Sequence, residues 1–184
     1  MLEMLDYIRQ GSEARLKISV EDIEFVASAL RDSILKGGKL VVFGNGGSAA
    51  DAQHFAAELT GRFMKERKSL PAIALSTNTS ALTAIGNDYS FEDVFSRQVS
   101  GLVTSSDTVV GISTSGNSSN VVYGLEVASR IGAFTVAMTG SSGGKISGIA
   151  KKTLRAESSV TPIIQEIHIC MIHMICMRLD ELLG

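Results

Sequence analysis

The chain has 184 residues, 45% of them hydrophobic and 20% charged, which suits a globular domain with a substantial buried core. Its formal net charge of −2 gives no basic surface for nucleic acid. Acidic residues interrupt the apolar N-terminus, which argues against a signal peptide, and no uninterrupted apolar run approaches the ~20 residues of a membrane span. We therefore expect a cytoplasmic protein with neither a membrane nor a nucleic-acid partner.

Helical spacing of apolar residues from residue 2 to residue 36, beginning with Leu2, predicts two helices before Gly37 and Gly38 end the second. Ser19 is the expected N-cap of that second helix, with Asp22 as its capping-box partner. The next predicted elements, in chain order, are a buried strand at 39–43, a glycine turn, a helix at about 49–63 and a strand at 72–75. Helices at about 92–104, 118–131 and 144–149 then alternate with strands at 108–112, 134–138 and, more weakly, 151–156.

Strands that alternate with helices imply parallel βαβ units, so the predicted fold class is α/β, with helices covering both faces of a parallel sheet. The closing segment, 161–183, is predicted to be one long helix, apolar nearly all round, of the kind buried in a core or a subunit interface. No linker, repeat or low-complexity segment divides the sequence. We therefore expect one domain over 1–184, with N-terminal helices at 1–36 and an α/β core at 37–184.

The segment GNGGSAADAQHFAAE, which starts at Gly44, follows a predicted strand and opens a predicted helix. Glycines let the backbone turn sharply and let a ligand approach its amides, and a helix N-terminus attracts anions. The segment also contains a capping pattern, Ser48 with Asp51, which is compatible with a turn that binds nothing. It matches the dinucleotide motif G-x-G-x-x-A as well, but residues 76–78 after the next strand include no acid for a ribose. A phosphate-type turn is the favoured interpretation.

A second loop, ISTSGNSSN at 112–120, also follows an apolar strand and precedes a helix. Hydroxyls and helix N-terminal amides without Lys or Arg suit a phosphate monoester in a neutral nest, and the loop lacks the GK[ST] of a nucleotide triphosphate site. Two such loops at the carboxyl ends of parallel strands predict a ligand crevice. The hydroxyls surround Gly116 and belong to Ser113, Thr114, Ser115 and Ser118.

Two pairs of polar residues are candidates for acid–base or metal chemistry. His54 and Glu58 are four apart, so both project from one face of a helix. Gln165 and His173 are eight apart on the apolar closing helix, about two turns. One explanation is that the pair on the closing helix forms hydrogen bonds across a subunit interface. The other is that all four residues converge as two nitrogen and two oxygen ligands for a divalent metal such as Zn²⁺, and sequence spacing leaves that choice open.

Four separated segments of the sequence resemble the phosphoheptose isomerase family, whose members are stand-alone sugar isomerase (SIS) domains. The segments are GNGGSAADAQHFAAELTGRF, AIGNDYSFEDVFSRQV, GISTSGNSSNV and IQEIHICMIH, and the resemblance runs from about residue 37 to residue 180. It implies a flavodoxin-like three-layer α/β/α sandwich and a homotetramer with active sites at subunit interfaces. It also implies conversion of sedoheptulose 7-phosphate to D-glycero-D-manno-heptose 7-phosphate, at the start of bacterial heptose synthesis for lipopolysaccharide.

The resemblance also implies roles for individual residues. Glu58 would be the general base and His173 the general acid of an ene-diol mechanism. One zinc ion per subunit would be held by His54, Glu58, Gln165 and His173. The phosphate would contact Ser113, Thr114, Ser115 and Ser118, and the rest of the substrate would contact Asn45, Gly46, Gly47, Glu58, Asn87, Asp88 and Gln165.

One position departs from the family pattern, because Pro162 stands where the family often has an acidic residue three positions before the glutamine. Proline is comfortable in the first turn of a helix, but a substrate-contacting carboxylate is lost. An isomerase of another sugar phosphate therefore stays open, as does an SIS module that senses one. A non-catalytic relative that binds the replication initiator is a further alternative, but such relatives lack the full catalytic set. The presence of both Glu58 and His173 favours the enzyme.

Overall fold

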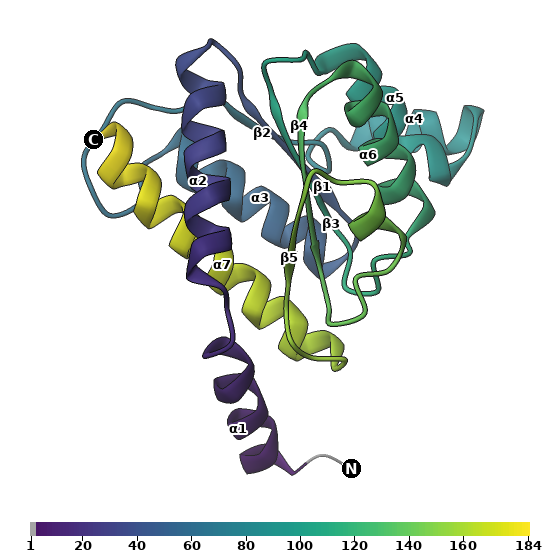
Figure 1. Ribbon diagram of the computed structural model, residues 1–184. Coiled ribbons are helices and arrows are strands. Elements are labelled where there is room, and N and C mark those ends of the chain that lie inside the picture. Colours follow the sequence, from purple (N-terminus) through teal and green to yellow (C-terminus); the bar gives the residue numbers. More distant parts are fainter. Residues whose placement is uncertain (1–2) are drawn as a thin grey trace.

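The computed structural model describes residues 3–184 and shows a parallel sheet between two layers of helices (Figure 1). The strand order is β2-β1-β3-β4-β5, with every neighbouring pair parallel. The strands are β1 Leu40–Gly44, β2 Ala72–Ala74, β3 Thr108–Ile112, β4 Phe134–Thr139 and β5 Lys152–Arg155. The helices are α1 Met4–Arg15, α2 Val20–Leu35, α3 Gly47–Thr60, α4 Thr79–Asp88, α5 Val94–Leu102, α6 Ser119–Ile131 and α7 Thr161–Leu183, with short 3₁₀ turns η1 Phe91–Asp93 and η2 Lys145–Gly148.

The central strand β1 explains why its sequence is apolar without interruption. Leu40 and Val42 enter the core on the side of α2, α3 and α7, whereas Val41 and Phe43 enter the core on the side of α5 and α6. A parallel strand covered by helices on both faces has no solvent side, so its apolar residues need not alternate with polar ones. The predicted α/β sandwich with a parallel sheet is confirmed.

The ends of two helices show which capping signals were effective. Ser19 is the N-cap of α2 and accepts a hydrogen bond from the Asp22 amide at 3.2 Å, as predicted. The Asp22 carboxylate does not complete a capping box, because it pairs with Lys152 of β5. The predicted Ser48–Asp51 cap is wrong: α3 begins two residues earlier, after Gly46, and Ser48 is buried in its first turn. Gly46 has a φ of +53°, so the backbone itself makes the turn without a side-chain cap.

The sequence pattern missed α4. Asn78 caps it by accepting a hydrogen bond from the Ala81 amide at 3.0 Å, but none of its residues is buried. The segment is short and holds only two large apolar residues, Leu82 and Ile85, which are partly buried against the core. Leu2, with which the first helix was predicted to begin, lies outside the described residues.

The closing helix α7 is the only helix among residues 3–184 that is long and apolar enough to cross a membrane by length and composition. Half of its apolar window is buried in the fold, where α7 packs against α1, α2 and α3. Its apolar residues continue the core under the sheet, and Asp180 near its end is also buried. We therefore describe α7 as a core helix, which is one of the two places predicted for it.

Candidate active site

The glycine turn joins β1 to α3 and places them beside α7. Asn45 and Gly46 form the turn, and Gly47 is the first residue of α3. A Cβ built on Gly47 would overlap the side-chain amide of Gln165, with the Gln165 Cδ only 2.9 Å away. The absence of a side chain at Gly47 thus lets Gln165 of α7 lie directly against the N-terminus of α3.

His54, Glu58 and His173 form a connected group of polar side chains at the contact between α3 and α7. The His54 Nε2 lies 3.2 Å from the Glu58 Oε1 and 3.0 Å from the His173 Nε2. The His54 side chain is 42% exposed and that of Glu58 is 23% exposed, so a ligand has access to both. Phe63 stacks on the other imidazole, with 5.5 Å between its ring centroid and that of His173. The structure therefore joins two residues from α3 to one from α7, 119 positions away from His54.

The side chains of His54, Glu58 and His173 offer nitrogen and oxygen donors of the kind that bind zinc. In the structure His54 contacts each of the other two residues separately. Within residues 3–184 no group of three or more His, Cys, Asp or Glu side chains is arranged as a metal centre. The 3.0 Å between the two imidazole nitrogens is nevertheless close to the ~3.3 Å that separates two ligands of tetrahedral zinc. Gln165 lies on the same helix as His173 and contacts Gly47 at the start of α3, the helix that carries His54 and Glu58. The donor set thus fits zinc.

The second loop presents hydroxyls at the carboxyl end of β3, next to the end of β1. The Ser113 Oγ is 3.0 Å from the Ser118 Oγ and 3.4 Å from the Ser115 Oγ. Ser118 is the N-cap residue of α6, but its hydroxyl makes no capping bond. Gly116 has a φ of +69° and touches the 140–144 turn so closely that a Cβ would overlap the Gly143 carbonyl. The loop is therefore closed on one side, and its hydroxyls gather above the start of α6.

Sequence reasoning missed Asn120, which joins the two loops. Asn45 donates to the Asn120 Oδ1 at 2.8 Å, and Asn120 donates to the Asn45 Oδ1 at 2.9 Å. Asn120 is only 3% exposed, so this reciprocal pair fixes the orientation of the Asn45 amide. The sequence signal that could have identified Asn120 is its position at the end of the second loop motif, ISTSGNSSN. The chain reverses its strand order between β1 and β3, which is where open α/β sheets bind ligands.

Asp51 is a second residue that sequence reasoning missed, because the capping pattern accounts for an acid at that position. It lies one turn before His54 on α3, and its Oδ2 is buried without a hydrogen-bond partner within the described chain. Burial raises the pKa of Asp51 to about 6, although the nearby His54 acts in the opposite direction. The helix face of His54 and Glu58 therefore carries a second carboxyl group, which the i, i+3 spacing indicated.

Two predicted site residues lie apart from this group in the single chain. Asn87 and Asp88 are exposed at the end of α4, and the Asn87 amide donates to the Asp88 Oδ1 at 2.9 Å. Helix α4 packs against η1 and α5, on the opposite side of the sheet from α3 and α7 (Figure 1). No hydrogen bond recorded for residues 3–184 joins either side chain to the two loops.

Comparisons with known proteins agree over nearly the whole chain. Residues 5–140 match the SIS domain family. A probable phosphoheptose isomerase of Thermoplasma acidophilum is 59% identical over 95% of this chain and 96% of its own length. The phosphoheptose isomerase of Aquifex aeolicus is 50% identical over 99% of this chain and 97% of its own. The solved structure of phosphoheptose isomerase GmhA from Neisseria gonorrhoeae superposes with a TM-score of 0.87 at 47% identity, over 95% of this chain and 92% of that one.

Proposed function

This chain belongs to the phosphoheptose isomerase family of SIS-domain proteins, and we propose that it converts sedoheptulose 7-phosphate to D-glycero-D-manno-heptose 7-phosphate. The observation that carries the proposal is the group of Glu58, His54 and His173, because it pairs a carboxylate with imidazoles at the helix that the first anion-suited loop opens. The Asn45–Asn120 pair joins that loop to the second one. A ketose with a distal phosphate requires both features. One set of groups moves protons at the sugar end, and another holds the phosphate.

The reaction transfers a hydrogen between adjacent carbons through an ene-diol. In the first half, the Glu58 carboxylate takes a proton from C1 of the ketose while an imidazole N–H of His173 donates a proton to the carbonyl oxygen on C2. In the second half, the O1 proton returns to His173 and Glu58 delivers its proton to C2, which leaves the aldehyde at C1. Both residues end in their starting states, as a catalytic pair must. His54 contacts both side chains and would hold them in position relative to each other.

The phosphate is assigned to the second loop. The hydroxyls of Ser115 and Ser118 lie 3.4 Å and 3.0 Å from that of the buried Ser113, and Thr114 stands between Ser113 and Ser115 in sequence. Neutral donors at a helix N-terminus hold a dianion without an ion pair. Asn45, oriented by Asn120, and the backbone of Gly46 and Gly47 would contact the sugar.

We also propose that His54, Glu58, Gln165 and His173 hold one zinc ion per subunit. Bound there, zinc would polarise the substrate oxygens that carry charge in the ene-diol. The support is the donor chemistry, the separation of the imidazole nitrogens and the contact between Gln165 and Gly47.

A homotetramer is proposed as well. The positions of Asn87 and Asp88 support it, since exposed polar residues on α4 would reach a site only in a neighbouring subunit. A cytoplasmic location and a role at the start of heptose synthesis for lipopolysaccharide remain predictions.

Replacement of Glu58 by Gln tests the assignment. The amide cannot accept the C1 proton, so we expect kcat with sedoheptulose 7-phosphate to fall by about 10³-fold while the melting temperature stays near that of the wild type. Glu66→Gln, at a side chain that is 88% exposed, is the matched control and should leave kcat unchanged. Full activity of Glu58→Gln would refute the base assignment.

Parallel assays with fructose 6-phosphate test the substrate, which matters because Pro162 replaces the usual acid. We expect turnover of the heptulose phosphate only. Turnover of neither sugar by the wild type would favour the alternative of a non-catalytic SIS module that senses a sugar phosphate.

A further inference from the structure

A buried ion pair joins the segment between α3 and β2 to α7, outside the group of side chains assigned to chemistry. The Arg67 Nε lies 2.7 Å from the Asp180 Oδ1, and the two side chains are 1% and 2% exposed. We propose that Arg67 and Asp180 are positioning residues that hold Glu58 and His173 at their working separation. This proposal rests on the catalytic roles proposed above for those two residues.

The guanidinium of Arg67 is bonded to the backbone of the residue that carries the base. Its Nη2 donates to the Glu58 carbonyl at 2.7 Å, and its Nη1 donates to the Leu59 carbonyl at 2.9 Å. The last carbonyls of a helix have no partner within the helix, and a cation there is favourable to the helix dipole. Arg67 thus fixes the last turn of α3 at Glu58.

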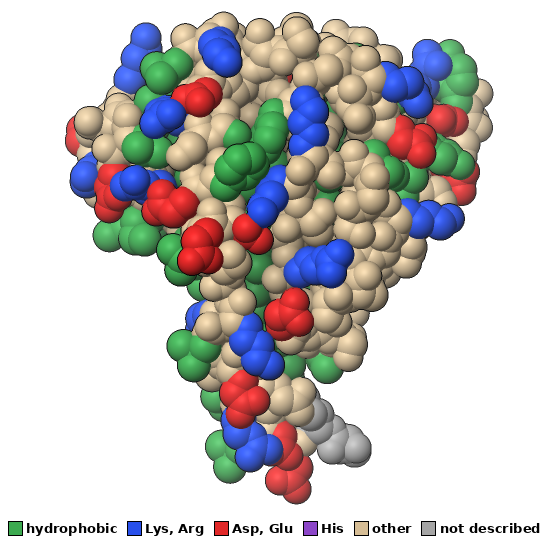
Figure 2. Space-filling view, in the orientation of Figure 1, with side chains coloured by type: hydrophobic (Ala, Val, Ile, Leu, Met, Phe, Trp, Pro, Cys, Tyr) green, Lys and Arg blue, Asp and Glu red, His purple; other side chains and the backbone are tan. Residues whose placement is uncertain are grey.

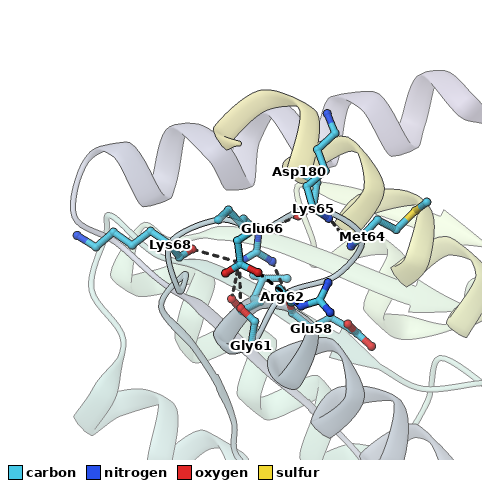
Figure 3. Close-up of polar contacts among 10 residues, drawn as sticks. Glu58, Gly61, Arg62, Met64, Lys65, Glu66, Lys68 and Asp180 are labelled. Atoms are coloured by element: carbon cyan, nitrogen blue, oxygen red, sulfur yellow. Dashed lines mark hydrogen bonds and ion pairs between the residues drawn. The ribbon is translucent and has the colours of Figure 1, made fainter.

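The carboxylate of Asp180 reaches the other half of the site. Asp180 lies seven residues, about two turns, after His173, so both project from the same face of α7. Its Oδ2 accepts from the Met64 amide at 2.8 Å and from the Lys65 amide at 2.9 Å (Figure 3). These amides directly follow Phe63, whose ring stacks on His173. Asp180 thereby fixes the segment that holds the imidazole in place.

The polar contacts of the pair favour a positioning role over simple packing. Burial alone would raise the pKa of Asp180, but hydrogen bonds from the Lys65 amide, the Arg67 guanidinium and the Met64 amide lower it below its ordinary value. Two apolar side chains of similar volume would fill the same space without desolvating two charges. Unlike an apolar pair, the ion pair orients backbone groups on both sides of the α3–α7 contact. A misplacement of ~1 Å in a catalytic group can lower the rate by about 10²-fold.

The test is the double variant Arg67→Met/Asp180→Leu, which removes both charges together so that neither remains buried alone. We expect kcat to fall by about 10²-fold and KM to change by less than about 3-fold, because the hydrogen bonds of Arg67 and Asp180 do not involve the phosphate loop. The matched control is Arg178→Met/Glu24→Leu, which removes a half-exposed ion pair between the same helix α7 and α2 and should leave kcat unchanged. Wild-type kcat in the folded Arg67→Met/Asp180→Leu variant overturns the proposal.

A second readout does not depend on activity. The protein has three histidines, so the ring protons of His173 can be followed by NMR, where the stacked Phe63 ring shields them. We expect the His173 signals to move downfield in Arg67→Met/Asp180→Leu and to stay in place in the control. Unmoved signals count against the proposal.

If the double variant does not fold, Arg67→Lys decides, because lysine keeps the charge but cannot bond Asp180 and two carbonyls as a fork. A fall in kcat of more than about 10-fold with unchanged KM supports the positioning role, and wild-type kcat refutes it. Failure of the proposed function would give a different result from failure of this proposal. Full activity of Glu58→Gln would show that Glu58 is not the base, whatever the Arg67 and Asp180 variants do.

Discussion

His168 shows how one buried residue makes the stability of this fold depend on pH. It is fully buried on α7, its Nε2 donates to the Thr139 carbonyl at 3.1 Å, and its Nδ1 has no partner within the described chain. Burial lowers the pKa of His168 to about 4, and the hydrogen bond to Thr139 only partly offsets this effect. The imidazole is therefore neutral in the folded chain at neutral pH. Its contribution to stability is present above pH 6.5, where the unfolded chain is neutral as well.

Between pH 6.5 and about pH 4 the unfolded chain binds a proton that the folded chain does not, so stability falls as pH falls. We expect His168 alone to remove about 3 kcal/mol from the free energy of unfolding over this range. Urea denaturation between pH 7 and pH 4, at fixed protein concentration, measures the slope. His168→Gln should flatten it. An equal slope in wild type and His168→Gln would contradict the argument.

At the scale of elements, the contact between α3 and α7 depends on the missing side chain at Gly47. In Gly47→Ala the new Cβ would overlap the Gln165 amide, which is the end of a flexible side chain and can move aside. We expect the free energy of unfolding to change by less than about 1 kcal/mol, because alanine is a better helix former than glycine. Displaced Gln165 should lower the zinc content per subunit and reduce kcat/KM by about 10-fold.

Metal analysis of the purified protein and the isomerase assay together check this prediction. Gly101→Ala is the matched control, because an added Cβ on that residue of α5 meets nothing within 4 Å. Wild-type zinc content and activity in Gly47→Ala would argue against Gln165 as a ligand.

At the scale of the whole molecule, α1 projects from the body and exposes apolar side chains among its charged ones (Figures 1 and 2). Met4, Leu5 and Ile8 are 86%, 78% and 61% exposed. Only one side of α1 packs on the chain, where Gly11 is buried and Tyr7 is hydrogen-bonded to Glu166 of α7. We expect a second subunit to cover the other side in the proposed homotetramer.

Leu5→Glu/Ile8→Glu tests that expectation, because it places charges on the face that would be buried between subunits. Sedimentation analysis should show a tetramer for the wild type and a smaller species for the variant, with activity lost if subunits complete one another's sites. Ser12→Glu, an exposed polar position on the same helix, should sediment like the wild type. A wild type that sediments as a monomer would rule out the tetramer.

The sequence by itself determined what depends on local periodicity. Alternating apolar segments predicted the parallel sandwich, and the four-residue spacing of His54 and Glu58 placed both on one helix face, since a helix repeats every 3.6 residues wherever it lies. The grouping of Ser113, Ser115 and Ser118 was also predictable, because one tight loop holds all three. Helix α4, which has only two large apolar residues, was missed.

Only the tertiary structure decided which of these local arrangements meet. His173 reaches His54 across 119 residues, Asn120 reaches Asn45 across 75, and Arg67 reaches Asp180 across 113. These contacts follow from the strand order and from the burial of α3 and α7 against the same face of the sheet. Burial of apolar surface selects that packing for the molecule as a whole, and no spacing along the chain encodes it.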